Sequence, residues 1–559
     1  MNDPARPALR RWFLAGLLLA LAFNFAIRWH LRQMPLERDE GEYAYAGQLL
    51  LQGIPPYKLA FNMKFPGVYF MYALLMAIFG QSTAGIHFGI FVITSITAVL
   101  IFFIGRELLT ESGGLMAAVI YVCLAALPKA AGLAGHATHF VALFVCGGVY
   151  ALLLARTRNS PGWWIASGTA FGLAILMVQQ AVFFPVFILV WLLWNGLQNR
   201  RQTSALSICF YCAGCVVPLL VTAIVFASIG LWNDFFIWTF QYAREYVSIL
   251  PMRAAPQQFG AGFDPVFESG IVAWIFGVAG LFCLWRQREG RGQPQDAARS
   301  LPEGRSSSKS GIRWTNVASL MFLAGMAAVC PGYYFRNHYF LMVMPGLALL
   351  DAAFIITVAN AVKGSVAANW SKWLPLGLVV FVVGNLVINN AGMWFGKTPG
   401  QLSRELYAAN PFSEAVPIAA YLKEHTTPSD TIAVLGSEPE IFFLADRHSA
   451  SGFIYVYALT EPQPLAPQMG REFISQIETS QPKYVVSVNM PLSWFSVIMP
   501  ESLRYAAAIQ DWWAGYSTNY DLVGAVKSSA TGILQIDWAE PSMNASITTN
   551  EDLLIYRRK

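Results

Sequence analysis

Charged side chains are scarce in this 559-residue chain. Only 12% of its residues are Asp, Glu, Lys or Arg, whereas 56% are hydrophobic and the mean hydropathy is +0.47. This composition excludes an ordinary soluble domain and indicates an integral membrane protein with many spans. The formal net charge is +5, but no basic stretch is interleaved with aromatic residues. We therefore expect contacts with membrane lipids and no nucleic-acid partner.

The polar C-terminal region lacks cysteine, and the chain lacks a glycine-rich phosphate-binding loop. All seven cysteines lie in apolar stretches, so the polar C-terminal region has no disulfide of its own. Cys209, Cys212 and Cys215 have no histidine or fourth thiol nearby, which favours packing on a helix over a metal site. No glycine-rich phosphate loop occurs in an α/β context, so a soluble nucleotide substrate is not expected.

Eleven apolar runs are long enough, at about 17 to 25 residues, to cross a bilayer. They are centred near residues 21, 96, 121, 147, 171, 189, 216, 277, 322, 349 and 382. The first, Trp12–Trp29, has no processing site at its end and is predicted to be a retained span. Arg6, Arg10 and Arg11 precede it and place the N-terminus in the cytoplasm.

A shorter apolar run covers residues 66–80 and would reach only roughly 22 Å as a helix. Counting it as a span would move every later basic loop to the outside, against the positive-inside rule. We therefore predict eleven spans, with this run as a juxtamembrane or re-entrant helix on the outer face. The predicted fold is a polytopic α-helical membrane protein with outer-face juxtamembrane helices and a C-terminal extracytoplasmic α/β domain.

The composition divides the chain into two modules. Residues 1–395 form the predicted transmembrane module, with a first outer loop at 31–85 and a flexible cytoplasmic linker loop at 287–312. Residues 396–559 form the predicted extracytoplasmic domain. In it, TIAVLG and KYVVSV are typical of strands, and PFSEAVPIAAYLKEH and EFISQIETS of helices.

Carboxylates concentrate directly after the first apolar run. Glu37, Arg38, Asp39, Glu40 and Glu42 occur within six residues. Four further polar segments share the outer face on the predicted topology: GHATHF at 135–140, MVQQ at 177–180, the loop at 232–269, and YYFRNHY at 333–339. We expect these five loops to converge on one site.

The first outer loop carries a recognisable pattern: an acidic pair, then E-Y-A-Y, then Y-K and M-K-F-P-G. This pattern resembles the C-type superfamily of integral-membrane glycosyltransferases, and within it families 39 and 83, which are related to protein O-mannosyltransferases and to the aminoarabinose transferase of lipid A. The resemblance covers roughly residues 10–395. It implies a polyprenyl-phosphate sugar as donor and transfer to an acceptor on the outer face of the cytoplasmic membrane, usually with inversion.

The resemblance also implies roles for individual residues. Asp39 corresponds to the catalytic carboxylate and general base, Glu40 to its partner, and Lys64 to a contact with the donor phosphate. The chain departs from the pattern at Val178, where relatives often carry a lysine before the two glutamines, and this puts a phosphate contact at that corner in doubt.

The chemistry needs a base on one side of the sugar and cations on the other, where the phosphate departs. The outer-face cations available to hold a phosphate are Lys58, Lys64, Arg244 and Arg336. The residues expected to line the substrate site are Tyr43, His136, His139, Gln179, Gln180 and His338.

Each assignment has an alternative. Asp39 could cap the helix that follows it, Lys64 could snorkel to lipid headgroups, and the tyrosines could form an interfacial belt. His136 and His139 could hold a divalent cation together with Asp39 or Glu40. The acidic loop permits such an ion without requiring it, so no metal ligand and no cofactor is assigned.

The function predicted from these residues is transfer of a hexose or pentose to a glycolipid, polysaccharide or protein acceptor in the cell envelope. A transporter or flippase of a lipid-linked substrate is the alternative, but the carboxylates lie at the membrane surface and no inverted repeat is evident. A non-catalytic assembly protein is a further alternative, although the acidic pair is intact.

Overall fold

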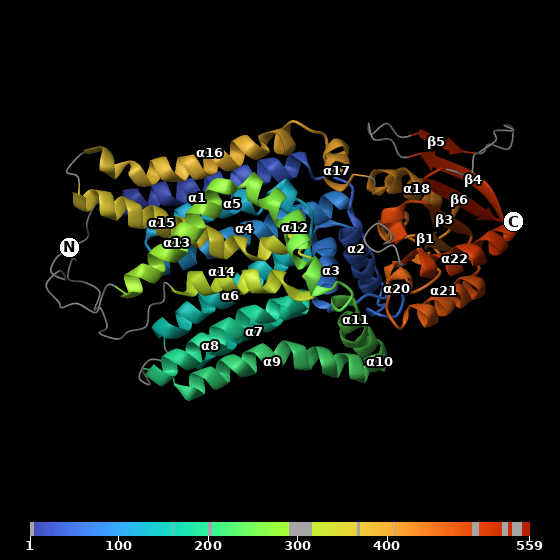
Figure 1. Cartoon of the computed structure of the whole chain (residues 1–559), viewed down its shortest axis with the longest axis horizontal. Helices are drawn as coiled ribbons and strands as arrows, with labels where there is room; N and C mark the ends of the chain where they lie inside the picture. Colours follow the sequence, from blue (N-terminus) through green and yellow to red (C-terminus); the bar gives the residue numbers. More distant parts are fainter. Residues whose placement is uncertain are drawn as a thin grey trace.

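The protein consists of a long helical bundle with a sheet domain at one end (Figure 1). The structure is a computed structural model that describes residues 5–158, 160–198, 204–289, 316–365, 369–408, 410–494, 502–527, 535–538 and 551–559. The N-terminal end of the first helix and the sheet domain lie at opposite ends of the bundle. The predicted polytopic helical fold with a C-terminal α/β domain is confirmed.

A helix lies at each of the eleven predicted span centres. These helices are α1 (Ala5–His30), α4 (Thr83–Leu108), α5 (Glu111–Leu124), α6 (Ala137–Arg158), α7 (Pro161–Met177), α8 (Phe183–Gln198), α9 (Ala205–Ser228), α13 (Ile271–Glu289), α14 (Asn316–Val329), α15 (Met344–Ser365) and α16 (Leu374–Phe395).

The helices differ in their ability to cross a membrane. Among the described residues, seven helices are long and apolar enough, and an eighth span results if Met252–Ser269 and Ile271–Arg286, bent by 100°, count as one. The apolar helices α5, α7 and α14 are shorter, with 14, 17 and 14 described residues. A 14-residue helix reaches only about 21 Å, so helix length supports seven or eight spans rather than the predicted eleven.

Two short helices lie at the end of the bundle that faces the sheet domain (Figure 1). They are α2 (Arg38–Leu51) and α3 (Gly67–Phe79), and they pack together at Gly47, where a Cβ atom would come within 2.9 Å of the Ala73 nitrogen. The run predicted to be a juxtamembrane or re-entrant helix thus forms a 13-residue helix. Its position outside the membrane stays a prediction.

The predicted outer loop at 232–269 is largely helical. It contains α10 (Trp232–Phe236), a π-helical turn at Ile237–Tyr242, α11 (Ala243–Val247) and α12 (Ala255–Ser269). Shorter 3-10 turns follow at Pro331–Tyr333 and Asn337–Met342. Of the predicted linker at 287–312, the first three residues belong to α13, and residues 290–312 lie outside the described residues.

The sheet domain is built on six strands in the order β2-β1-β3-β6-β4-β5. The strands are β1 (Thr431–Leu435), β2 (His448–Ser449), β3 (Tyr484–Val488), β4 (Tyr520–Lys527), β5 (Gln535–Trp538) and β6 (Leu553–Arg558). β1 is parallel to β2 and β3, whereas β6 pairs antiparallel with β3 and β4, and β5 with β4. The two predicted strand motifs form β1 and the fully buried β3.

Helices accompany these strands in the C-terminal region. They are α17 (Pro399–Tyr407), α18 (Phe412–His425), α19 (Glu440–Ala445), α20 (Tyr457–Thr460), α21 (Ala466–Ser480) and α22 (Ser502–Tyr516). The two predicted helix motifs of this region form α18 and part of α21. The division of the chain at residue 396 stays a prediction.

Helix α2 fits closely against the sheet domain. A Cβ atom at Gly41 would lie 2.5 Å from the Glu440 nitrogen at the start of α19, so only glycine permits this approach. Arg38 donates to the Ser437 carbonyl and the Tyr457 hydroxyl, and forms an ion pair of 3.1 Å with Glu438. The acidic turn of α2 is therefore held between the two modules.

Candidate active site

The acidic turn begins α2 through a reciprocal cap. The Glu37 carboxylate accepts the Glu40 N–H at 2.8 Å, and the Glu40 carboxylate accepts the Glu37 N–H at 3.3 Å. This capping box satisfies two of the N–H groups that have no partner within the helix. Glu37 is thus the N-cap, and the alternative that Asp39 caps this helix is wrong.

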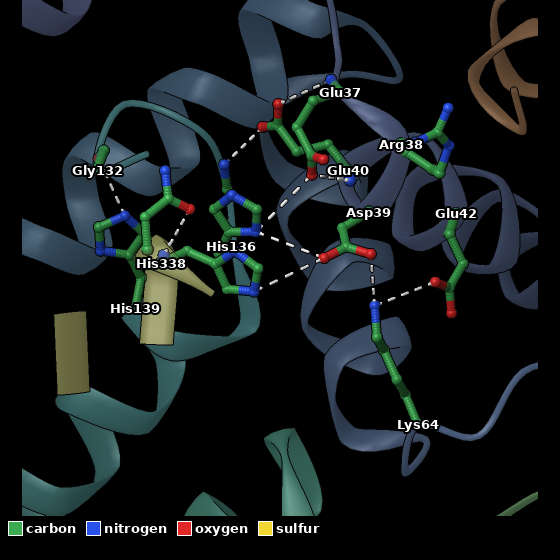
Figure 2. A network of polar contacts seen from close by, with 12 residues as sticks. Glu37, Arg38, Asp39, Glu40, Glu42, Lys64, Gly132, His136, His139 and His338 are labelled. Atoms are coloured by element: carbon green, nitrogen blue, oxygen red, sulfur yellow. Dashed lines mark hydrogen bonds and ion pairs between the residues drawn. The ribbon is translucent and has the colours of Figure 1, made fainter. Parts of the chain in front are cut away.

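Asp39 lies between a lysine and two histidines (Figure 2). Its Oδ1 is 2.7 Å from Lys64 Nζ, while its Oδ2 is 3.8 Å from His136 Nδ1 and 3.9 Å from His338 Nε2. Lys64 also contacts Glu42 at 3.3 Å and lies over the Tyr43 ring. Four segments that are remote in the sequence therefore meet at one carboxylate.

The ion pair keeps Asp39 charged. Burial acts to raise its pKa, but the Lys64 ammonium holds the pKa of this carboxyl well below its usual range. Burial likewise acts to lower the pKa of Lys64, but Asp39 and Glu42 raise it well above its ordinary value. Asp39 is consequently a carboxylate at neutral pH.

Glu40 has a different environment. Its side chain is fully buried, and Oε1 accepts from His87 Nε2 at 3.0 Å and from the Gly135 N–H at 2.6 Å. A Cβ atom at Gly135 would lie 3.1 Å from Glu40 Oε1 and 2.3 Å from the Tyr72 hydroxyl, so glycine is needed here. Glu40 thus joins the start of α2 to α4 and to the loop before α6.

His136 and His338 stack face to face beside Asp39, with ring centroids 4.1 Å apart. Burial lowers the pKa of both rings, so both are neutral. Neither nitrogen of the buried His136 ring has a hydrogen-bond partner among the described residues. One ligand atom each from Asp39, His136 and His338 lies within 4.8 Å of the others. Two neutral imidazoles and a carboxylate fit a divalent cation.

A cavity of about 440 Å³ opens beside these groups, between the bundle and the sheet domain. The predicted residues that line it are Asp39, Tyr43, Lys64, His136, Gln179, Gln180, Arg336 and His338. Gln179 donates to the Met63 carbonyl at 2.6 Å, which ties the MVQQ segment to the Lys64 loop.

Other predicted residues lie elsewhere. His139 is buried on α6 and bonds the Gly132 carbonyl at 3.0 Å (Figure 2). Lys58 and Arg244 are absent from the described lining of the cavity. Lys58 lines a separate groove, and Arg244 is exposed and pairs with the adjacent Glu245 at 2.8 Å. The structure does not bring these three side chains to Asp39.

Sequence reasoning missed the contribution of the sheet domain. Tyr455, Tyr457 and Glu461 line the same cavity, and Tyr455 donates to the Arg38 carbonyl at 2.8 Å. Tyr242 faces them from the π-helical turn and donates to Glu461 at 2.6 Å. No local motif distinguishes these residues, because only the docking of two modules makes them neighbours.

Comparison with known proteins supports the same fold. The family model described as dolichyl-phosphate-mannose-protein mannosyltransferase matches residues 63–227. The undecaprenyl phosphate-alpha-4-amino-4-deoxy-L-arabinose arabinosyl transferase 1 of Pseudomonas fluorescens (strain Pf0-1) is 24% identical over 299 residues, which cover 51% of this chain and 51% of that protein. The chain thus spans about half the length of this curated relative.

Solved structures match over more of the chain. ArnT from Cupriavidus metallidurans bound to undecaprenyl phosphate aligns with a TM-score of 0.54 and 17% identity, covering 88% of this chain and 95% of ArnT. The oligosaccharyltransferase AglB from Archaeoglobus fulgidus, in complex with an inhibitory peptide and a dolichol-phosphate, aligns with a TM-score of 0.53 and 11% identity. The alignment covers 96% of this chain and 75% of AglB. The resemblance to the C-type superfamily of integral-membrane glycosyltransferases is therefore confirmed, and this chain has the fold of that superfamily.

Proposed function

We propose that this protein is a membrane glycosyltransferase that moves a sugar from a polyprenyl-phosphate donor to an acceptor hydroxyl, with Asp39 as the general base. The observation that carries the proposal is the Asp39–Lys64 pair of 2.7 Å at the wall of a cavity between the two modules. The carboxylate can take the acceptor proton once the ammonium has left it for an oxygen of the donor phosphate. Relatives named for undecaprenyl- and dolichyl-phosphate chemistry support the donor class.

Lys64 and Arg336 are the proposed phosphate contacts. Both side chains line the cavity, and both are cationic donors suited to phosphate oxygens. Lys58 and Arg244 have no part in the proposal, because they lie outside the described lining of this cavity.

The reaction follows from a change of partner at Lys64. When the donor phosphate takes the Lys64 ammonium, Asp39 loses the charge that lowers its pKa and becomes a stronger base. The acceptor oxygen then bonds to the anomeric carbon, and its proton passes to Asp39. The bond from that carbon to the phosphate oxygen breaks, and polyprenyl phosphate leaves with the electron pair. Attack opposite the leaving group inverts the anomeric centre.

Glu40 is proposed as a positioning residue. Its hydrogen bonds to His87, Gly135 and the Glu37 N–H fix the first turn of α2 and hence the direction of the next carboxylate. Tyr43, His136, His338, Gln179 and Gln180 would contact the substrates, since all five line the cavity.

A divalent cation would be held by Asp39, His136 and His338. Such an ion supplies positive charge that stabilises a departing phosphate. Titration calorimetry with Mn²⁺ tests this assignment: the wild type should bind one ion and His136→Ala should bind it at least tenfold more weakly. Absence of binding by the wild type, or equal binding by the variant, would refute it.

The proposed location is the cytoplasmic (inner) membrane, with the N-terminus in the cytoplasm and the sheet domain outside. The basic flank at Arg6, Arg10 and Arg11 supports this orientation. The proposed partners are the lipid-linked donor, membrane lipids and a glycolipid, polysaccharide or protein acceptor. Whether the sugar is a hexose or a pentose is open to the assay below.

The decisive experiment offers radiolabelled polyprenyl-phosphate sugars to protein in proteoliposomes together with a panel of glycolipid, polysaccharide and protein acceptors. Wild type should transfer one sugar, whereas Asp39→Asn should bind the same donor and fail to transfer it. If the folded wild type moves labelled lipid across the bilayer without transfer, the alternative of a flippase replaces this proposal.

A further inference from the structure

A second carboxyl group, Glu461, faces the cavity from the sheet domain. Glu461 is the C-cap residue that directly follows helix α20, its side chain is fully buried, and it belongs to the lining of the cavity beside Asp39. Its backbone is well fixed, because its N–H donates to the Tyr457 carbonyl and its own carbonyl accepts from the Gln463 N–H, both at 2.8 Å. The cavity is thus lined by carboxyl groups from both modules: Glu37 and Asp39 at the start of α2, and Glu461 in the sheet domain.

The two oxygens of Glu461 are unequally satisfied. Oε2 accepts the Tyr242 hydroxyl at 2.6 Å, across a separation of 219 residues. Oε1 is buried and has no hydrogen-bond partner among the described residues. A buried carboxylate oxygen without a donor is costly, so a group that enters the cavity and donates a hydrogen bond to Oε1 would be stabilised there.

The surroundings of Glu461 restrict the chemistry of that group. The titratable groups that face it are Arg336, Tyr242, Tyr246, Tyr334 and Tyr457. Tyr246 and Tyr334 stack with centroids 4.5 Å apart, and Trp238 packs edge-to-face on Tyr242. A carboxyl with a free oxygen amid aromatic rings suits a ring that carries hydrogen-bond donors.

We propose that Glu461 is a specificity-determining residue that accepts a hydrogen bond from a hydroxyl or protonated amino group of a sugar-bearing substrate. This inference rests on the proposed function and deepens it. The phosphate of the donor is excluded from this position, because two anions would repel each other. The sugar therefore lies in the cavity between Asp39 and Glu461, with its phosphate within reach of Lys64 and Arg336.

The hydroxyl or amino group that donates to Glu461 can belong to the donor sugar or to the acceptor, and kinetic measurements distinguish the two. Glu461→Gln keeps an oxygen for Tyr242 but directs an amide toward the substrate. We expect kcat/KM for transfer to fall about 10- to 100-fold, as for loss of a charge-assisted hydrogen bond. A rise in KM for the lipid donor would assign the contact to the donor sugar, and a rise in KM for the acceptor would assign it to the acceptor.

Two further variants control this test. Glu424→Gln changes an exposed carboxyl of α18 in the same domain and should leave kcat/KM unchanged. Tyr242→Phe retains the ring but removes the hydroxyl that orients Glu461, and should lower kcat/KM about 3- to 10-fold. If Glu461→Gln does not fold, Tyr242→Phe carries the test alone, and unchanged kinetics for it would then refute the inference.

A binding measurement separates a substrate contact from a structural role. Undecaprenyl phosphate without a sugar should bind wild type and Glu461→Gln equally, because the phosphate does not reach Glu461. If Glu461→Gln binds undecaprenyl phosphate as weakly, relative to wild type, as it binds the sugar-bearing donor, the proposed contact between Glu461 and the sugar is refuted. Kinetics for Glu461→Gln that match those of Glu424→Gln would also refute it. Neither result would affect the proposed function. A folded wild type that transfers no sugar would overturn the proposed function, and this inference with it.

Discussion

Asp39 and Glu40 are adjacent carboxylates in one helical turn, yet they have different surroundings. The Asp39 side chain is 26% exposed, borders the cavity and pairs with a single ammonium, whereas the Glu40 side chain is fully buried and accepts from His87, the Gly135 N–H and the Glu37 N–H. The roughly 100° between successive helical residues directs Asp39 toward the cavity and Glu40 into the bundle.

The difference shows that adjacent carboxylates of one acidic cluster can have separate roles. A carboxylate with filled hydrogen-bond positions stabilises structure, because every donor around it would lose its partner on removal. A carboxylate that borders a cavity and is held charged by one lysine remains open to a new partner. We therefore expect variants at the two positions to fail in different ways.

Asp39→Asn gives the largest expected effect. Removal of the base should lower kcat for sugar transfer about 10²- to 10⁴-fold, while the unfolding temperature changes little. Turnover of labelled donor at saturation, together with thermal unfolding, measures both quantities. Asp511→Asn, at an exposed aspartate of α22, is the matched control. Retained turnover in Asp39→Asn would remove Asp39 from the base role.

Glu40→Gln should show the opposite pattern. Loss of the charge leaves His87 and the Gly135 N–H with a weaker partner, and we expect the free energy of unfolding to fall by about 2–4 kcal/mol. Denaturation in detergent, with Glu424→Gln as control, measures the change. Wild-type stability combined with a lower kcat would instead indicate that Glu40 takes part in the chemistry.

Lys64→Met tests the cation that pairs with Asp39. Loss of the ammonium should weaken binding of the lipid donor about 10- to 100-fold, because a charge-assisted contact to phosphate is lost. Lys58→Met, at a lysine outside the described cavity lining, should leave that affinity unchanged. Equal effects of the two substitutions would point to general attraction of anionic lipid and against a phosphate site at Lys64.

The pH dependence gives the smallest effect and separates Glu461 from Asp39. Burial raises the pKa of Glu461 to about 7, although the Tyr242 hydrogen bond and Arg336 lower it. The fraction of Glu461 that is deprotonated, and so able to accept a hydrogen bond with both oxygens, therefore increases as pH rises through 7. We expect kcat/KM to rise over the same range. Asp39, whose pKa lies below its usual range, should add no limb near pH 7. The rising limb should disappear in Glu461→Gln, and its persistence there would assign it to another group.

The sequence alone was sufficient for much of the fold. Scarce charge and long apolar runs require a helical membrane bundle, and alternating patterns after residue 396 indicate an α/β domain, because both follow from short-range periodicity. The number of spans was less certain, since α5, α7 and α14 are apolar but short, and apolarity also marks helices buried in protein.

The candidate site was predictable only in part. The motif around Asp39 and Lys64 is local, and the outer loops with His136, Gln180 and His338 reach the cavity beside it. Lys58, His139 and Arg244 have the same residue types in equally polar segments but lie elsewhere. Side-chain direction, which composition does not encode, separates the two sets.

The sequence by itself determined a membrane-embedded helical protein with one cluster of carboxylates at the end of its first span. The tertiary structure alone decided which carboxylates border the cavity, that Glu40 is buried away from it, and that the sheet domain supplies Glu461 to the same cavity as Asp39. The physical reason is the separation along the sequence of the residues that interact. Hydropathy and helix capping depend on residues a few positions apart, whereas this cavity depends on two modules that meet through Arg38 and Gly41.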